Sequence, residues 1–238
     1  MLVRRSLVVL ALTLAVVRCT DQPTALQQSL QSPDVAQVPQ YVRWARNVAP
    51  QFTVISEQTQ SKHHGRPVRS PPLSLDTYSV SFWAVRGEAR SVSINYASAI
   101  DTLTHPFMQL TVTDPTFAPG QGDIAVGDSV FVTVNIDTTK IGLTLEPTGL
   151  QFGEPAQLRV WYGGALGDMN GDGVVDSVDG NIENLLLGLG YRESDSDPWT
   201  RVPATQSLAD QSFISALPHF CQFAIEYAEE LLDWTVAW

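Results

Sequence analysis

The chain has 238 residues, of which 44% are hydrophobic and 16% charged, and 25 acidic against 14 basic side chains give a net charge of −11. This apolar content excludes a wholly disordered chain, and the length is sufficient for one or two domains with a full core. The acidic balance argues against a nucleic-acid-binding protein, because such surfaces are normally basic.

The N-terminus has the order of charge and hydrophobicity that is typical of an export signal. Arg4 and Arg5 precede an apolar run at residues 7–17, LVVLALTLAVV. The run is too short to span a bilayer comfortably, so it predicts an export signal over residues 1–19 rather than a membrane helix. We therefore expect an exported protein of the cell envelope, or a secreted one.

A cysteine follows the apolar run at once. An apolar run followed by Cys19 resembles the signal of bacterial lipoproteins, although Arg18 stands where that motif has Gly or Ala. The polar residues after Cys19 would suit a tether behind a lipid anchor, so the chain is either lipid-anchored or released. If Cys19 is lipidated or removed with the signal, Cys221 is the one remaining cysteine, and a disulfide framework is excluded.

Residues 20–75 are rich in Gln, Ser, Pro and Thr and are predicted to form a flexible linker. Within them, Tyr41–Asn47 (YVRWARN) could form one or two helical turns that dock on the domain. His63 and His64 form no metal site alone, since further ligands would be needed.

From residue 76 onward the sequence has the period-2 alternation of β-strands, separated by turn signals such as Arg86-Gly87. The predicted strands are Tyr78–Val85, Ser91–Tyr96, Phe107–Thr113, Ser129–Ile136 and Leu158–Tyr162. Short strands at this spacing predict a mainly β fold, an antiparallel β-sandwich over residues 76–238.

Two helices are predicted near the end of the chain. In Val178–Gly188 the spacing places Ile182, Leu185, Leu186 and Leu189 on one face, which we expect to dock on the sandwich. Ile225–Trp234 (IEYAEELLDW) has an apolar stripe opposite acidic residues, which predicts a C-terminal helical tail.

The run Asp168–Asp179 (DMNGDGVVDSVD) matches the spacing of a twelve-residue EF-hand loop. The predicted ligands are the side chains of Asp168, Asn170, Asp172, Asp176 and Asp179 and the backbone carbonyl of Val174. Calcium takes six to eight oxygen ligands, and alternating positions on a curled loop can supply them. The carboxylates would repel one another without a cation, so the sequence predicts one Ca²⁺ site.

Other positions of the same run predict how the loop is held. Gly173 allows the sharp turn at position 6, and Val175 at position 8 is expected to pin the loop to the core. Because a predicted strand precedes the loop, we expect a strand–loop–helix unit, inserted in the sandwich at residues 163–198. Binding should be weak, around 10⁻⁴ M as in extracellular modules, and the ion's role structural.

Three segments together resemble ZU5-like domains over roughly residues 125–225. Residues 146–158 contain the order P-x-G-x-x-F-x-x-P-x-x-L, Trp199–Pro203 resembles the family's W-x-x-V-P strand, and His219–Ala224 resembles its closing H-F-S-x-Y-A strand with Cys221 for Ser. The resemblance implies a β-sandwich module of cell-surface and scaffold proteins, usually without enzymatic activity.

The expected function is therefore a non-enzymatic structural or interaction module of the cell envelope, with an unidentified protein partner. The sequence has no H-E-x-x-H, G-x-S-x-G or G-x-x-x-x-G-K motif. One alternative is a self-cleaving domain in which Cys221 attacks the carbonyl of Phe220 with help from His219, as the resemblance suggests. Another is a dockerin-like protein-binding module, although dockerins contain two such calcium loops.

Overall fold

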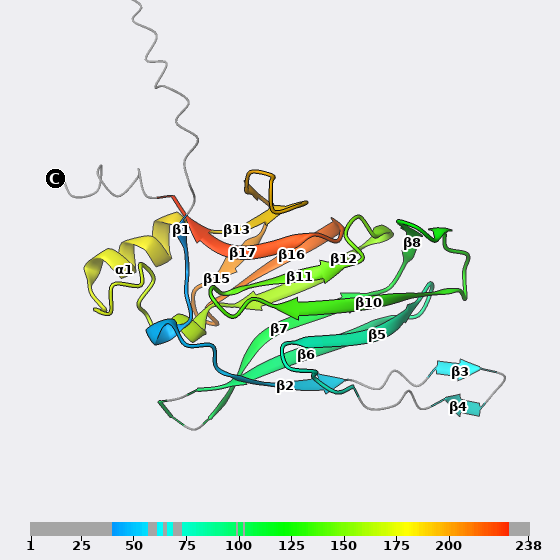
Figure 1. The fold of residues 1–238 in the computed structure, drawn as a ribbon, viewed down its shortest axis with the longest axis horizontal. Helices are drawn as coiled ribbons and strands as arrows, with labels where there is room; N and C mark the ends of the chain where they lie inside the picture. Colours follow the sequence, from blue (N-terminus) through cyan, green and yellow to red (C-terminus); the bar gives the residue numbers. More distant parts are fainter. Residues whose placement is uncertain are drawn as a thin grey trace, which may run out of the picture. The chain divides into compact units, whose positions relative to one another are not determined.

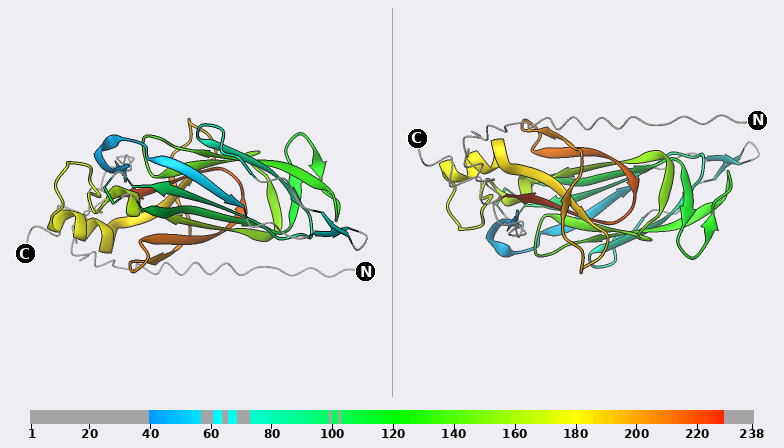
Figure 2. Two further views of the ribbon diagram at one scale, coloured as in Figure 1. Left: turned by 90° about the horizontal axis from the view of Figure 1, so that it is seen from below. Right: turned by 90° about the horizontal axis from the view of Figure 1, so that it is seen from above.

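The computed structural model describes residues 40–56, 61–63, 66–68, 73–98, 100–101 and 103–228. They form two antiparallel β-sheets that enclose one apolar core (Figure 1, Figure 2), which confirms the predicted mainly β, antiparallel sandwich. The predicted export signal, Cys19 and the first part of the predicted linker lie outside the described residues.

The elements divide between the two sheets as follows. The first sheet contains β1 (Gln40–Tyr41), β5 (Ser79–Val85), β10 (Ser129–Ile136), β11 (Gly142–Glu146), β13 (Leu187–Arg192), β14 (Thr200–Arg201) and β17 (Gln222–Tyr227), in the order β14-β13-β17-β11-β10-β5, with β1 also paired to β17. The second contains β2 (Gln51–Ser56), β6 (Arg90–Ala97), β7 (Thr104–Val112), β8 (Pro115–Ala118), β9 (Gly122–Asp123), β12 (Gln151–Trp161), β15 (Thr205–Ser207) and β16 (Ser212–His219), in the order β15-β16-β12-β7-β6-β2, with β8 also paired to β12 and β9 paired to β8. A separate ladder joins β3 (Ser61–His63) to β4 (Arg66–Val68). The helical segments are η1 (Ala45–Asn47), η2 (Gly163–Ala165), α1 (Ser177–Asn181) and η3 (Ile182–Leu186).

Alternation along the strands explains the sandwich. In β10, Val130, Val132 and Val134 are buried, whereas Phe131 between them is 49% exposed. Val132 lies opposite Phe82 of β5, which is buried on the same inner face. Because successive side chains of a strand point to opposite faces, the period-2 pattern gives each sheet one apolar face, and the two apolar faces pack together.

The N-terminal segment belongs to the sandwich. β1 pairs with β17, and β2 pairs with β6 over its full length. Between these strands Val42 and Trp44 are fully buried, and η1 forms the helical turn expected within Tyr41–Asn47. The predicted linker is therefore wrong for residues 40–56, where two apolar side chains and two strand pairings outweigh a composition rich in Gln and Pro.

The helix predicted over Val178–Gly188 is present but shorter. It comprises α1 and the wider turn η3, and the chain becomes β13 at Leu187. Ile182 and Leu186 are buried as expected, whereas Leu185 is 65% exposed and does not dock. Residues 163–198 therefore do not form a simple insertion, because they supply a strand of the first sheet.

The predicted C-terminal helix does not begin at Ile225. Residues up to Tyr227 form β17, which pairs with β13 on one side and with β11 and β1 on the other. Main-chain pairing on both sides fixes Ile225 as strand, whatever the helical period of its neighbours. Residues 229–238, which carry the rest of the predicted helix, lie outside the described residues.

The segment His219–Ala224 crosses from one sheet to the other and is not the single strand that was predicted. β16 ends at His219 in the second sheet, and β17 begins at Gln222 in the first. At the crossing, the amide of Phe220 donates to Leu150 and the carbonyl of Cys221 accepts from Leu145. Both crossing residues are buried, so they fill the space between the sheets.

Candidate calcium site

The predicted calcium loop lies at one end of the sandwich, between β12 and α1 (Figure 1). After β12 the chain makes the turn η2 and passes through Leu166 and Gly167, both with positive φ (56° and 87°). The loop follows, and α1 begins at Ser177. The structure thus confirms the strand–loop–helix arrangement that the sequence predicted.

The first half of the loop is curled around Asp168. One carboxylate oxygen accepts a hydrogen bond from the amide of Gly171 at 2.8 Å, and the other accepts from Gly173 at 2.9 Å. Both glycines have positive φ, 76° and 87°, which residues with a Cβ rarely adopt. Asn170 accepts from the amide of Asp172, whose own carboxylate accepts from Val174 at 2.8 Å. The turn expected at Gly173 is therefore present.

Asp179 closes the loop on itself. It is 2% exposed, and one oxygen accepts from the amides of Met169 and Asn170 at 2.7 and 3.2 Å. The other accepts from the amide of Asp176 at 2.9 Å, while the Asp176 side chain caps α1 by accepting from Val178. Position 12 thus has a structural role that the sequence analysis did not predict, since it joins both ends of the loop.

Met169 anchors the loop, in place of the residue predicted for that role. Met169 is 1% exposed, and Val178 packs partly buried against the core. Val175, which was expected to pin the loop to the core, is 65% exposed. The prediction is wrong because α1 places Val178, and not position 8, toward the sheets.

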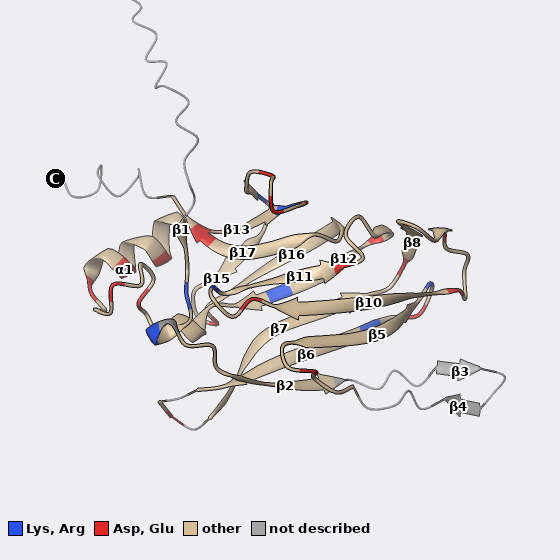
Figure 3. Cartoon of the chain, in the orientation of Figure 1, with Lys and Arg blue, Asp and Glu red and all other residues tan. Residues whose placement is uncertain are grey.

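The oxygen donors of the loop suit a hard cation in kind, with four carboxylates and one amide side chain within twelve residues. In the described part of the chain, no three Asp, Glu, His or Cys side chains form a group that could hold a metal ion. The carboxylates instead accept from backbone amides, which leaves further lone pairs on each oxygen. Acidic residues of this loop are shown in red in Figure 3.

The crossing at Phe220 and Cys221 is the second place where the sequence suggested chemistry. The amide of Gly149 donates to the Phe220 carbonyl at 2.8 Å, and His219 Nδ1 lies 3.5 Å from the same oxygen. Cys221 is buried, and burial, together with the charge of Glu193, raises the pKa of its thiol. The structure brings the histidine to the carbonyl but keeps the thiol protonated, which disfavours nucleophilic attack.

No protein-family model, curated protein or solved structure matches the chain. Within the described residues, no helix is long and apolar enough to cross a membrane.

The sequence analysis missed the cavities next to the loop. Residues 43–50, expected to be linker, form one wall of two of them. The alternation of Tyr41, Val42, Arg43 and Trp44 was the available signal, since it places Val42 and Trp44 on one face. The turn signals around it concealed this short strand-like stretch.

Proposed function

We propose that this chain is an exported, non-enzymatic β-sandwich module that binds one Ca²⁺ in the loop Asp168–Asp179. The observation that carries the proposal is the curled loop itself. Its EF-hand spacing is combined with positive-φ glycines at positions 4 and 6 and with a position-12 carboxylate that joins the two ends. The residues that would hold the ion are Asp168, Asn170, Asp172, Asp176, Asp179 and the carbonyl of Val174.

The ion would act as a structural staple. The loop connects β12 of the second sheet to α1, which leads through η3 into β13 of the first sheet. Neutralising the loop's carboxylates would remove their mutual repulsion and fix the connection between the two sheets. A cell-envelope module exposed to millimolar calcium would then be stabilised by mass action.

Thermal unfolding with and without calcium tests this proposal. For a site of about 10⁻⁴ M, 10 mM calcium stabilises the fold by about 2.7 kcal/mol. This corresponds to a rise in Tm of about 5–10 °C for a domain of this size. Asp172→Asn should reduce the rise, because it removes one of the four carboxylates of the loop. It should have little effect on metal-free stability, because Asp172 is exposed and the amide oxygen can still accept from Val174.

The matched control is Asp123→Asn, which removes an exposed carboxylate of β9 outside the loop. This variant should keep the full calcium shift. Asp179→Ala is unsuitable as the only test, because its three amide hydrogen bonds make it destabilising even without metal. An unchanged Tm of the parent chain at 10 mM calcium would reject the site.

Self-cleavage between Phe220 and Cys221 is the second candidate function. The Gly149 amide favours it, because a donor at 2.8 Å from the Phe220 carbonyl would stabilise negative charge on that oxygen. The buried, protonated thiol opposes it. A dockerin-like function has less support, because the described residues contain one calcium-type loop in a β-sandwich rather than two in a helical module.

A further inference from the structure

Two neighbouring cavities form a continuous groove beside the calcium loop. The first, of about 340 Å³, lies between the segment after β1 and the loop. The second, of about 270 Å³, continues along the same segment toward Pro50. They share Ala45, Arg46, Ile100 and Leu166 as lining residues. We call this feature the end groove, and its walls carry Arg43, Arg46, Val48, Ile100, Leu166 and Val175.

The walls of the end groove are unusually apolar for a solvent-exposed surface. Val48 is 67% exposed, Val175 65% and Ile100 56%. Leu166 is exposed as well. Single exposed aliphatic side chains need no explanation, but several around one concave surface indicate a binding site for an apolar group.

The two arginines of the groove are the second observation. Arg43 and Arg46 are exposed, and among the described residues neither forms a salt bridge or a side-chain hydrogen bond. By contrast, Arg86, Arg159 and Arg192 each pair with an aspartate. Two unpaired arginines are conspicuous in a chain with 25 acidic residues.

The backbone holds Arg46 in a strained position. Its φ is 59° and its ψ 19°, a left-handed conformation that residues other than Gly, Asn and Asp adopt uncommonly. Trp44, buried two residues earlier, donates its indole N–H to the carbonyl of Asp137 at 2.9 Å and so fixes this segment. The structure therefore presents the Arg46 side chain at the groove at a conformational cost.

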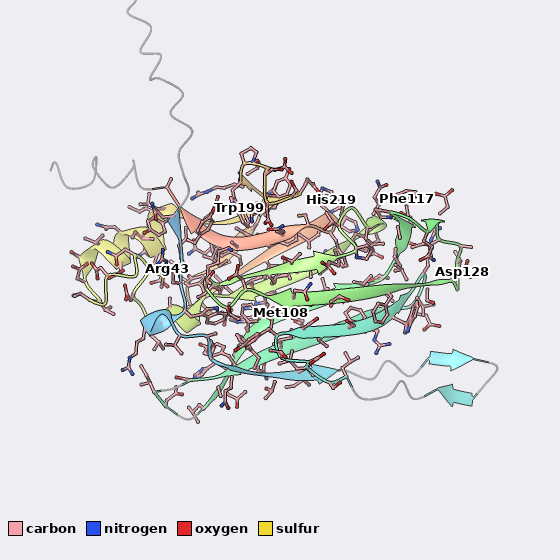
Figure 4. The ribbon with its side chains drawn as sticks, in the orientation of Figure 1. Arg43, Met108, Phe117, Asp128, Trp199 and His219 are labelled. Carbon is pink, nitrogen blue, oxygen red and sulfur yellow. The ribbon has the colours of Figure 1, made fainter. Side chains whose placement is uncertain are left out.

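We propose that the end groove binds an acidic peptide segment with large apolar side chains. The apolar walls would receive those side chains, and Arg43 and Arg46 would pair with the flanking carboxylates. Asp168 and Asp172 of the loop line the same cavity, and the side chain of Arg43 lies close to Gly171. Arg43 is labelled in Figure 4. Calcium would neutralise these two carboxylates and so strengthen the binding of an acidic segment; this dependence rests on the proposed calcium site.

The chain itself supplies a suitable probe, because residues 229–238 have the sequence EELLDWTVAW, with three acids among apolar residues. A labelled peptide of this sequence is titrated into the full chain, with 5 mM calcium or with a chelator, and binding is followed by fluorescence anisotropy. The same titration uses the peptide with its acids replaced by Gln and Asn. We expect the acidic peptide to bind, more tightly with calcium, and the neutral peptide to bind at least about tenfold more weakly.

Variants of the full chain, which is the receptor for the peptide, then locate the binding site. Arg43→Gln with Arg46→Gln, or Ile100→Ser, should weaken binding severalfold. Arg159→Gln should not, because Arg159 already pairs with Asp210 outside the groove. Binding that is unaffected by the groove variants, or equal for the neutral peptide, would overturn the proposal.

Three further outcomes are informative. If the parent chain does not bind but a receptor with Glu229→Gln, Glu230→Gln and Asp233→Asn does, the chain's own segment occupies the groove, which supports the proposed chemistry. No binding to either receptor rejects it. If binding depends on the arginines but not on calcium, and calcium does not change the Tm, the calcium site is rejected and the peptide-binding groove is supported.

Discussion

Trp44→Ala tests whether the N-terminal segment is part of the folding core. Trp44 is 2% exposed and contacts the rings of Phe52, Tyr96 and Phe107, with ring centroids 5.1–5.8 Å apart. A Cβ on Gly164 would lie 2.5 Å from its indole ring, so the ring packs directly against the backbone of Gly164. Truncating a buried aromatic residue costs about 3–5 kcal/mol, because the cavity does not fully collapse.

A lost hydrogen bond adds to this cost. The indole N–H donates to the carbonyl of Asp137. The alanine variant lacks this donor, and the lost hydrogen bond costs about 1 kcal/mol or more of folding free energy. The total corresponds to a fall in Tm of about 10 °C or more. We would measure it by urea unfolding and by calorimetry on the full chain.

The matched control is Trp83→Ala. Trp83 is 54% exposed on β5 and contacts mainly Phe131 of the neighbouring strand. Its truncation should cost about 1 kcal/mol or less, as for an exposed cross-strand pair. If Trp44→Ala were no more destabilising than Trp83→Ala, the segment would be a peripheral tether, and its assignment to the core would be refuted.

Two other predictions concern buried groups. Glu226 is 5% exposed with one oxygen unpaired within the described residues, and burial raises its pKa although Arg201 opposes this. A carboxyl group whose pKa is raised in the folded state stabilises the fold in acid, and this stabilisation is lost as the pH rises through that pKa. Glu226→Gln should therefore stabilise the chain at pH 7 and not at pH 4. Urea unfolding midpoints of parent and variant at both pH values test this, and equal effects at the two pH values would contradict it. For the crossing at Cys221, intact mass and a denaturing gel of the native protein should show no break after Phe220, and the same mass reports removal of residues 1–18 and a lipid on Cys19. Two fragments that disappear in Cys221→Ala would establish cleavage.

The local hydrophobic pattern was sufficient to predict a strand wherever one face of that strand is buried and the other is exposed. β10 was predicted with its observed bounds, because Ser129–Ile136 alternates throughout. The hydrophobic pattern failed to predict secondary structure where strand pairing determines it. Ile225 is in a strand because it pairs with Leu189, 36 positions earlier in the chain. It also failed at Gln40–Ser56, where two short strands find partners far along the sequence.

The candidate site divides in the same way. Spacing alone predicted the turn at Gly173 and the strand–loop–helix order, because both follow from positions within twelve residues. It could not predict that Val175 faces solvent or that Asp179 accepts from three backbone amides, since both depend on how α1 meets the sheets. The alternation of Tyr41–Trp44 could have indicated one wall of the end groove, but not the groove itself, because its walls come from segments more than a hundred residues apart.

The position of β17 has a consequence for the order of assembly. This strand, the last one described, lies between β13 and β11, and its end also pairs with β1, the first one described. During synthesis the first sheet cannot close until residue 227 has emerged, because its central strand comes last. Such non-local pairing delays closure of the first sheet until β17 is available. A protein whose first sheet closes this late would keep the two halves of that sheet unjoined while the strands between them are being made.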